Sequence, residues 1–326
     1  MWLKSGYDLK QKFILWVEDY LFYPNFFQKI ISFLLLPLTF IYVFIILLKR
    51  SFANKIDFGI PVVSVGNLTI GGSGKTPITI KLASQYKDVC VILRGYGRAS
   101  KGLVIVSLNG NIKVDVKQSG DEAMLLARNL KNATIIVSEN RENAIIKAKE
   151  LGCKIVFLDD GFSKYHIEKF DILLRAKKEP TNIFCLPSGA YREPKSFYSK
   201  ANLELKESRD FRRVVTIKKD GIKAELPLKT LLLTAISKPK RLLEFLPKNI
   251  QLLAFEDHHT FTKDEIDEIL EKYKDFSIVT TQKDFVKLES FGLKNVYLMD
   301  LDIEFSINLD LGELQAYINS FSYFFI

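Results

Sequence analysis

The chain reads Gly71-Gly72-Ser73-Gly74-Lys75-Thr76-Pro77 shortly after an apolar run, residues 61–65, and before a helical pattern over residues 78–83. A strand, a glycine loop and a helix in this order predict a phosphate-binding loop, because backbone N–H groups and the helix N-terminus can surround a phosphate. Lys75 would supply charge to the β- and γ-phosphates, and the Thr76 hydroxyl would reach Mg²⁺. We therefore expect a nucleotide to bind Gly71, Gly72, Ser73, Gly74, Lys75 and Thr76.

The loop departs from the standard Walker A pattern, because Thr69 occupies the position of the first glycine. The form x-G-G-x-G-K-T also occurs in membrane-partitioning ATPases, but those carry a signature lysine where this chain has Ile70. That residue argues against the partitioning class. A glycine turn without a ligand is the alternative interpretation of the loop.

Composition limits the partners. The chain has 326 residues, enough for two domains, and a net charge of +9, which suits nucleic acid, anionic lipid or a phosphorylated substrate. No nucleic-acid-binding motif accompanies the charge, so we expect no nucleic acid partner. The 3 cysteines lie in apolar contexts without a Cys-x-x-Cys pattern, which predicts reduced, buried thiols and no zinc site.

The N-terminal segment is apolar: no charged residue occurs from Ile30 to Leu48, a length of roughly 30 Å as a helix, about one bilayer core. Aromatic residues just before it fit an interfacial belt, and residues 9–21 have the spacing of an amphipathic surface helix. We expect an N-terminal membrane helix, either spanning the bilayer or kinked at Pro37 and inserted shallowly. A buried core helix is the alternative.

Apolar strands alternate with helical patterns from residue 61 to 158, which predicts a parallel sheet covered on both faces. Ligands of such sheets bind at the carboxyl ends of the strands, where the glycine loop, Arg94, Asp159 and Asp160 fall. Asp220-Gly221 between strand-like runs predicts a β-hairpin. The expected fold is α/β: a membrane anchor (1–55), a P-loop NTPase-like domain (56–212), a linking hairpin or ribbon (213–228) and a smaller α/β domain (229–326).

Four further groups carry possible chemistry. Asp159 and Asp160 end a strand, where P-loop enzymes hold Mg²⁺. Asp121 begins a helix and by itself would be a cap. His258 and His259 could accept a hydroxyl proton, or lie in a surface loop whose Thr260 caps the next helix. Arg192 could hold a phosphate, or pair with Glu193 at the surface.

Together these motifs resemble one family, tetraacyldisaccharide 4′-kinase of the lipid A pathway. The resemblance runs through Val65–Pro77, Arg94–Arg98, Gly120–Ala123, Leu158–Phe162, Leu186–Pro194, Asp257-His258 and Thr281–Asp284. It implies ATP- and Mg²⁺-dependent phosphorylation of the 4′-hydroxyl of a tetraacylated glucosamine-disaccharide 1-phosphate, the lipid A precursor. It also implies a bacterial inner-membrane location among phospholipids, with the catalytic domains on the cytoplasmic face and no known protein partner.

By the same resemblance, Asp121 works with His258 as a base dyad and Lys75 acts in catalysis. Thr76, Asp159 and Asp160 serve Mg²⁺. Site-lining positions are Arg94, Glu122, Arg141, Arg192 and Glu193.

One departure is that the family usually reads D-D-G-F-Q-H, whereas this chain has Ser163 and Lys164 after Phe162; Lys164 or His166 could substitute. The alternative functions are a membrane-anchored P-loop switch ATPase or GTPase, and a kinase of another membrane lipid.

Overall fold

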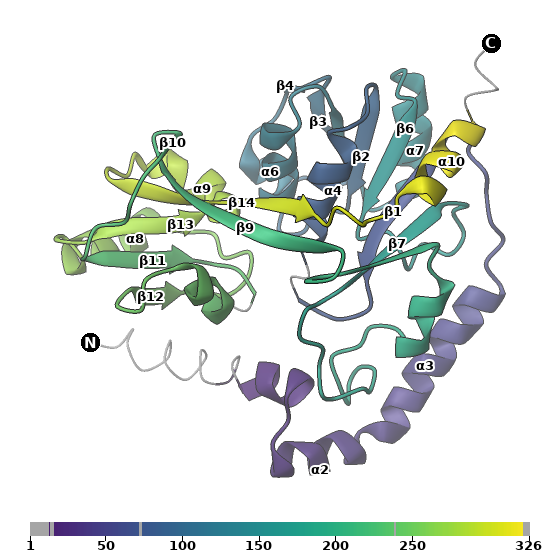
Figure 1. The fold of residues 1–326 in the computed structure, drawn as a ribbon, viewed down its shortest axis with the longest axis horizontal. Coiled ribbons are helices and arrows are strands. Elements are labelled where there is room, and N and C mark those ends of the chain that lie inside the picture. Colours follow the sequence, from purple (N-terminus) through teal and green to yellow (C-terminus); the bar gives the residue numbers. More distant parts are fainter. Residues whose placement is uncertain (1–12, 14–15, 72–73, 238, 322–326) are drawn as a thin grey trace. The chain divides into compact units, whose positions relative to one another are not determined.

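The computed structural model describes residues 13, 16–71, 74–237 and 239–321 (Figure 1). The chain forms two compact units. The first unit contains residues 1–75, 160–211 and 307–326, and the second contains residues 76–159 and 212–306.

The first unit holds three parallel strands, β1 (Val62–Asn67), β7 (Phe170–Arg175) and β8 (Leu203–Lys206), in the order β1-β7-β8. All six residues of β1 are buried, as the apolar run predicts for a strand covered on both faces. Near the chain end, α10 (Gly312–Ser320) docks through Tyr317, whose hydroxyl donates to the Val62 carbonyl over 3.3 Å. η1 (Lys195–Lys200) precedes β8.

In the second unit, β2 (Val89–Leu93), β5 (Thr134–Val137) and β6 (Ile155–Asp159) are parallel, which confirms the predicted parallel core. Two antiparallel strands, β3 (Val104–Leu108) and β4 (Asn111–Ile112), extend this group to the order β4-β3-β5-β2-β6. The accompanying helices are α4 (Lys75–Ala83), α5 (Val116–Ser119), α6 (Asp121–Asn129) and α7 (Arg141–Glu150).

A second sheet follows, in the order β10-β9-β14-β13-β11-β12. The predicted hairpin is confirmed as β9 (Phe211–Lys219) and β10 (Ile222–Lys223), with Asp220 and Gly221 both at positive φ in the turn. The other strands are β11 (Thr230–Thr234), β12 (Gln251–Ala254), β13 (Ser277–Thr281) and β14 (Val296–Phe305). The helices are η2 (Pro239–Phe245), α8 (Lys263–Lys272), α9 (Gln282–Leu288) and η3 (Glu289–Phe291).

The N-terminal apolar segment is not one helix. It forms α2 (Phe26–Leu34) and α3 (Leu36–Ser51), bent by 57° at Leu35, because Pro37 at the start of α3 cannot continue the hydrogen bonds of α2. By length and apolar character, none of the described helices could cross a bilayer alone, whereas the bent pair together could. The predicted single membrane helix is therefore not confirmed. Residues 16–22 are helical, and most of the predicted surface helix before them lies outside the described residues.

Helices α2 and α3 bury polar side chains together with Ile46, and leave most of their large apolar side chains exposed. Gln28, Ser32 and Thr39 are buried, and the Ser32 hydroxyl donates to the Ser188 carbonyl over 2.6 Å. The exposed side includes Phe26 at 73%, Phe27 at 75%, Leu34 at 75%, Phe40 at 70% and Phe44 at 60%. So many exposed large apolar side chains are unusual on a helix that faces water.

Arg50, in the last turn of α3, is held by three aromatic rings. Its guanidinium carbon lies 5.5 Å from the ring centre of Phe162, 5.1 Å from that of Tyr165 and 4.7 Å from that of Phe197. We call these four residues the Arg50 cage. The cage joins the apolar helix to Phe162, which follows the Asp159-Asp160 pair by two residues.

Candidate active site

The glycine loop follows β1 and ends where α4 begins at Lys75. Gly71 and Gly74 have φ angles of 82° and 85°, which a residue with a side chain rarely adopts. Gly72 and Ser73 lie outside the described residues. The strand, loop and helix context that gave the motif its meaning is thus present on both sides of the loop.

Cationic groups of the first unit gather on Asn67 and Asp160. Lys75 Nζ donates to Asn67 Oδ1 over 3.0 Å and lies 3.8 Å from Asp160 Oδ1. Arg192 binds both oxygens of Asp160, each over 2.8 Å, and donates to Asn67 Oδ1 over 2.7 Å. The amide of Asn67 is oriented by its own donation to the Thr69 carbonyl over 2.7 Å. Arg192 thus holds a carboxylate of the Asp-Asp pair in this structure.

In the second unit, the Thr76 hydroxyl donates to Asp159 Oδ2 over 2.9 Å, and the Thr79 hydroxyl lies 3.5 Å from Oδ1. A hydroxyl and a carboxylate are hard oxygen ligands of the kind that Mg²⁺ prefers. No group of three or more His, Cys, Asp or Glu side chains suited to a metal occurs in the part of the chain that the structure describes. In kinases Mg²⁺ is typically held by one or two carboxylates together with substrate phosphates and water.

Asp121 and His258 lie together within the second unit. Asp121 is the first residue of α6, after the N-cap Gly120, and its Oδ1 accepts from the Glu122 N–H over 2.8 Å. His258 follows β12 in a loop, with φ at 62°, a costly angle for a residue other than glycine. Its Nδ1 lies 3.1 Å from Asp121 Oδ1 and 3.2 Å from Oδ2. The structure therefore brings the two expected dyad residues together.

Two lysines of α9 face the same carboxylate. Lys283 Nζ lies 3.9 Å from Asp121 Oδ2, 3.2 Å from Glu122 Oε1 and 3.3 Å from Asp257 Oδ1. Lys287 Nζ lies 3.6 Å from Asp121 Oδ2. We call these five residues the lysine–carboxylate cluster. Sequence reasoning missed both lysines; Lys283 stood only inside the quoted Thr281–Asp284 motif, without a role.

The cluster sets the charge states of the dyad. Burial acts to raise the pKa of Asp121, but the hydrogen bond from His258 and the charge of Lys283 lower it to about 2. The hydrogen bond to Asp121 raises the pKa of His258 above its usual 6.5, against the opposing effects of burial and Lys283. Asp121 is thus ionised at neutral pH, and His258 is the more basic member of the pair.

The other expected residues are divided. Arg94 donates to the Tyr96 hydroxyl over 3.3 Å, and the Tyr96 ring centre lies 6.4 Å from that of His258, so Arg94 is linked to the dyad. Arg141 is buried at the start of α7, where it donates to the Ser138 carbonyl. Glu193 is buried in the first unit and accepts a hydrogen bond from Tyr165.

His259 lies apart from His258's partners: its Nε2 is 3.1 Å from Glu265 and its ring stacks on Phe255. Thr262, and not Thr260, is the N-cap of α8. For His166, the described contact is its carbonyl, which accepts from the Ile56 N–H over 2.9 Å.

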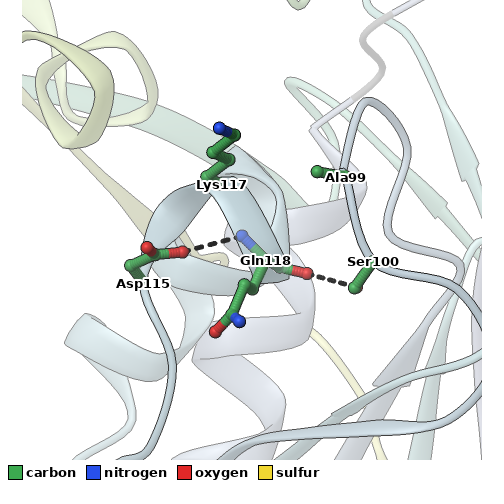
Figure 2. Close-up of a pocket in the computed structure, with 5 residues that line it drawn as sticks. All are labelled: Ala99, Ser100, Asp115, Lys117 and Gln118. Atoms are coloured by element: carbon green, nitrogen blue, oxygen red, sulfur yellow. Dashed lines mark hydrogen bonds between the residues drawn. The ribbon is translucent and has the colours of Figure 1, made fainter.

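A shallow pocket on the second unit contains none of the expected site residues. Figure 2 shows its lining, Ala99, Ser100, Asp115, Lys117 and Gln118. Two hydrogen bonds lie within this lining: the Ser100 hydroxyl donates to the Gln118 carbonyl and the Gln118 N–H donates to Asp115 Oδ1. Asp121 and His258 are not among the residues of the pocket.

Comparison with known proteins decides the family. The family described as LpxK, tetraacyldisaccharide-1-P 4′-kinase, matches residues 31–320. The chain belongs to this family. It is 69% identical over 313 residues to the tetraacyldisaccharide 4′-kinase of Aliarcobacter butzleri, an alignment that covers 96% of this chain and 100% of that protein. It is 45% identical over 309 residues to the kinase of the same description from Helicobacter pylori, covering 94% and 96% of the two chains.

A solved LpxK structure has a similar fold. The crystal structure of LpxK from Aquifex aeolicus, described as an "apo" form in complex with ATP, shares 27% identity and a TM-score of 0.70, covering 89% of this chain and 99% of that one. Membership of the LpxK family makes this chain a lipid kinase, and the interpretation as a switch ATPase or GTPase is set aside.

Proposed function

We propose that this chain transfers the γ-phosphate of ATP to the 4′-hydroxyl of a tetraacylated glucosamine-disaccharide 1-phosphate, as the description of its family indicates. The observation that carries the proposal is the 3.1 Å contact between Asp121 and His258, which supplies a proton acceptor for an attacking hydroxyl. Its relatives carry the same description across nearly their full lengths.

In the proposed reaction, the hydroxyl oxygen forms a bond to the γ-phosphorus as the bond from that phosphorus to the β-phosphate oxygen breaks, and ADP leaves. Asp121 accepts the hydroxyl proton. Because the pKa of Asp121 is lowered to about 2, the carboxylate is ionised and free to accept that proton, while Nδ1–H of neutral His258 donates to it over 3.1 Å and holds it in place. Lys75 balances negative charge on the phosphoryl oxygens. We propose that Arg94 and Glu122 line the part of the site that receives the acceptor hydroxyl. Arg141, Arg192 and Glu193 are the other residues that we propose as site-lining.

We propose that Mg²⁺ is held by Thr76 and Asp159, with Asp160 next in the chain. Mg²⁺ would neutralise charge on the β- and γ-phosphates. The described donors fit, since the Thr76 hydroxyl and the Asp159 carboxylate are already 2.9 Å apart. We further propose that Gly71, Gly72, Ser73 and Gly74 surround the phosphates.

We also propose that the chain divides by function at residues 55, 212 and 228, into a membrane anchor, a P-loop kinase domain, a linking hairpin and a smaller α/β domain.

We propose that α2 and α3 contact the inner membrane from the cytoplasmic side. Their exposed phenylalanines and leucines form a surface that lipid covers more favourably than water, whereas the polar Gln28, Ser32 and Thr39 are buried on the other side of the helices. The acylated substrate would then be phosphorylated without leaving the lipid phase. The net charge of +9 adds attraction to anionic headgroups.

The test is transfer of labelled γ-phosphate from ATP in detergent micelles containing tetraacyl-disaccharide 1-phosphate. We expect labelled lipid with the wild type and a sharp loss with His258→Ala. ATP hydrolysis without labelled lipid would reject the proposed acceptor. Equal labelling by both proteins would keep the kinase and remove His258 from the reaction.

A further inference from the structure

Lys283 contacts carboxylates from two chain segments that are far apart in the sequence. Asp121 and Glu122 begin α6, whereas Asp257 precedes His258 in the loop after β12. The Lys283 ammonium lies within 3.9 Å of all three, and only 16% of its side chain is exposed. A single cation therefore joins the two segments that carry the dyad.

Lys283 lies beside a second, largely buried lysine, and the repulsion between the two charges must be offset by nearby carboxylates. Lys283 and Lys287 are four residues apart on α9, where like charges repel. Their side chains are only 16% and 9% exposed, so water screens them poorly. Asp121 lies between them, at 3.9 Å and 3.6 Å, and offsets the repulsion. Asp284, fully buried, holds Lys287 at 3.2 Å and is itself fixed by Thr234 over 2.7 Å.

We propose that Lys283 is a positioning residue for the phosphoryl transfer: it ties the His258 loop, through Asp257, to the start of α6 and so holds His258 against Asp121. The inference rests on the proposed function, because it assigns Lys283 a part in the dyad of that reaction. Without its cation, the three carboxylates would repel one another and the loop would separate from α6.

The groups that face His258 separate a positioning role of Lys283 from a purely electrostatic one. Asp121 on α6, Asp257 in its own loop and Lys283 on α9 act on its charge, and the Tyr96 ring lies beside it. The charge of Lys283 lowers the pKa of His258, so loss of that charge alone would raise this pKa in Lys283→Met. Loss of the hydrogen bond to Asp121, the largest cause that raises the pKa, would lower it instead, and this is what a positioning role predicts.

The experiment is an NMR titration of the His258 ring, one of 3 histidines in the chain, assigned with His258→Gln. In Lys283→Met we expect the pKa of His258 to fall, because the hydrogen bond to Asp121 is lost, and kcat for lipid labelling at pH 7 to fall about tenfold, with KM for ATP unchanged. Lys283→Arg should restore most of kcat, because it keeps the charge. Lys147→Met, which removes an exposed pair with Glu150, is the matched control and should behave as wild type.

An unchanged or raised pKa of His258 in Lys283→Met would overturn the inference, because the contact with Asp121 would then be intact. If Lys283→Met fails to fold, Asp257→Asn decides through kcat, which should fall because the tie of the loop is cut; an unchanged kcat would overturn the inference. Asp257 is 37% exposed, and its loss leaves no buried cation alone. The titration does not depend on lipid phosphorylation. Absence of labelled lipid with the wild type would therefore reject the proposed function alone.

Discussion

His258 Nδ1 lies 3.1 Å from Asp121 Oδ1, and 137 positions of sequence separate the two residues. Both belong to the second compact unit, although the boundaries expected from sequence put them in different domains. The pair is therefore assembled within one unit of the fold. An ionised carboxylate cannot donate a hydrogen bond, so the contact requires the proton on Nδ1 of His258 whenever Asp121 is charged.

Replacing Asp121 by Asn should remove the proton acceptor while keeping the size of the side chain. We expect kcat for lipid phosphorylation to fall by about 10²–10⁴-fold, with KM for ATP changed little, because the described contacts of Asp121 are with the dyad and the lysines. Initial rates at varied ATP and fixed lipid measure both constants. Turnover near that of the wild type would exclude Asp121 as the acceptor.

The pH profile should have its acid limb above pH 6.5. The pKa of His258 is raised above 6.5, and a charged ring beside Asp121 makes that carboxylate a weaker proton acceptor, so activity is lost as pH falls through that pKa. Asp121, with a pKa of about 2, stays ionised across this range and adds no limb. Plots of kcat/KM against pH from 5 to 9 test this. An acid limb near pH 4 would contradict the assignment.

The thermal stability of the protein should also depend on the protonation of His258, and the stabilisation should be greatest at low pH. Because folding raises the pKa of His258, its ion pair with Asp121 stabilises the fold below pH 6.5 and loses this effect as pH rises through the folded pKa. We expect the Tm difference between wild type and His258→Gln to be largest near pH 5.5 and to shrink by pH 9. A difference that is constant with pH would show that only packing is lost.

Thr76→Val should weaken the response to Mg²⁺. The variant keeps the shape of the side chain but removes the hydroxyl that lies 2.9 Å from Asp159. We expect the Mg²⁺ concentration for half-maximal activity to rise by about tenfold, equivalent to about 1.4 kcal/mol. Thr79→Val is the matched control, since its hydroxyl is 3.5 Å from the same carboxylate and should matter less. Equal Mg²⁺ requirements in wild type and Thr76→Val would remove Thr76 as a ligand.

Arg50→Gln should destabilise the protein by removing the cation from its aromatic cage. Three ring contacts of 4.7 to 5.5 Å suggest a loss of about 1–2 kcal/mol, or a Tm lower by about 2–6 °C. Lys49→Gln, an exposed neighbour in the same helix turn, is the control. Identical melting curves for the two variants would show that the cage contributes no stability.

Local features of the sequence were predictable, and long-range pairs were not. Strands β1, β2, β5 and β6 are largely apolar runs, and the Asp220-Gly221 turn fixes its hairpin. Each of these elements can therefore be predicted from a few consecutive residues. Strand β7 was missed because Asp171 interrupts its apolar run; that carboxylate is stabilised by Lys169 at 3.1 Å. β3 and β4 form an antiparallel addition that alternation of strands and helices does not predict.

The candidate site divides in the same way. The glycine loop is contiguous, so its spacing alone identified it, whereas the pairing of Asp121 with His258 came only from the family resemblance. The partner of Arg192 is Asp160, 32 positions away, where sequence offered a phosphate or the neighbouring Glu193. Lys283 was overlooked because an ion pair depends on how α9 packs on α6, which no pattern within either helix encodes.

The Arg50 cage also fixes the rotation of α3 about its own axis. The Arg50 side chain at the helix end contacts rings from two other segments, Phe162 and Tyr165 on one and Phe197 on the other. These contacts favour one rotation of α3 about its axis. The outward stripe of phenylalanines therefore points in a set direction relative to β1 and β7. An unrelated apolar helix joined at residue 51 would restore hydrophobicity but lose this orientation, so α2 and α3 cannot be exchanged independently of Phe162, Tyr165 and Phe197.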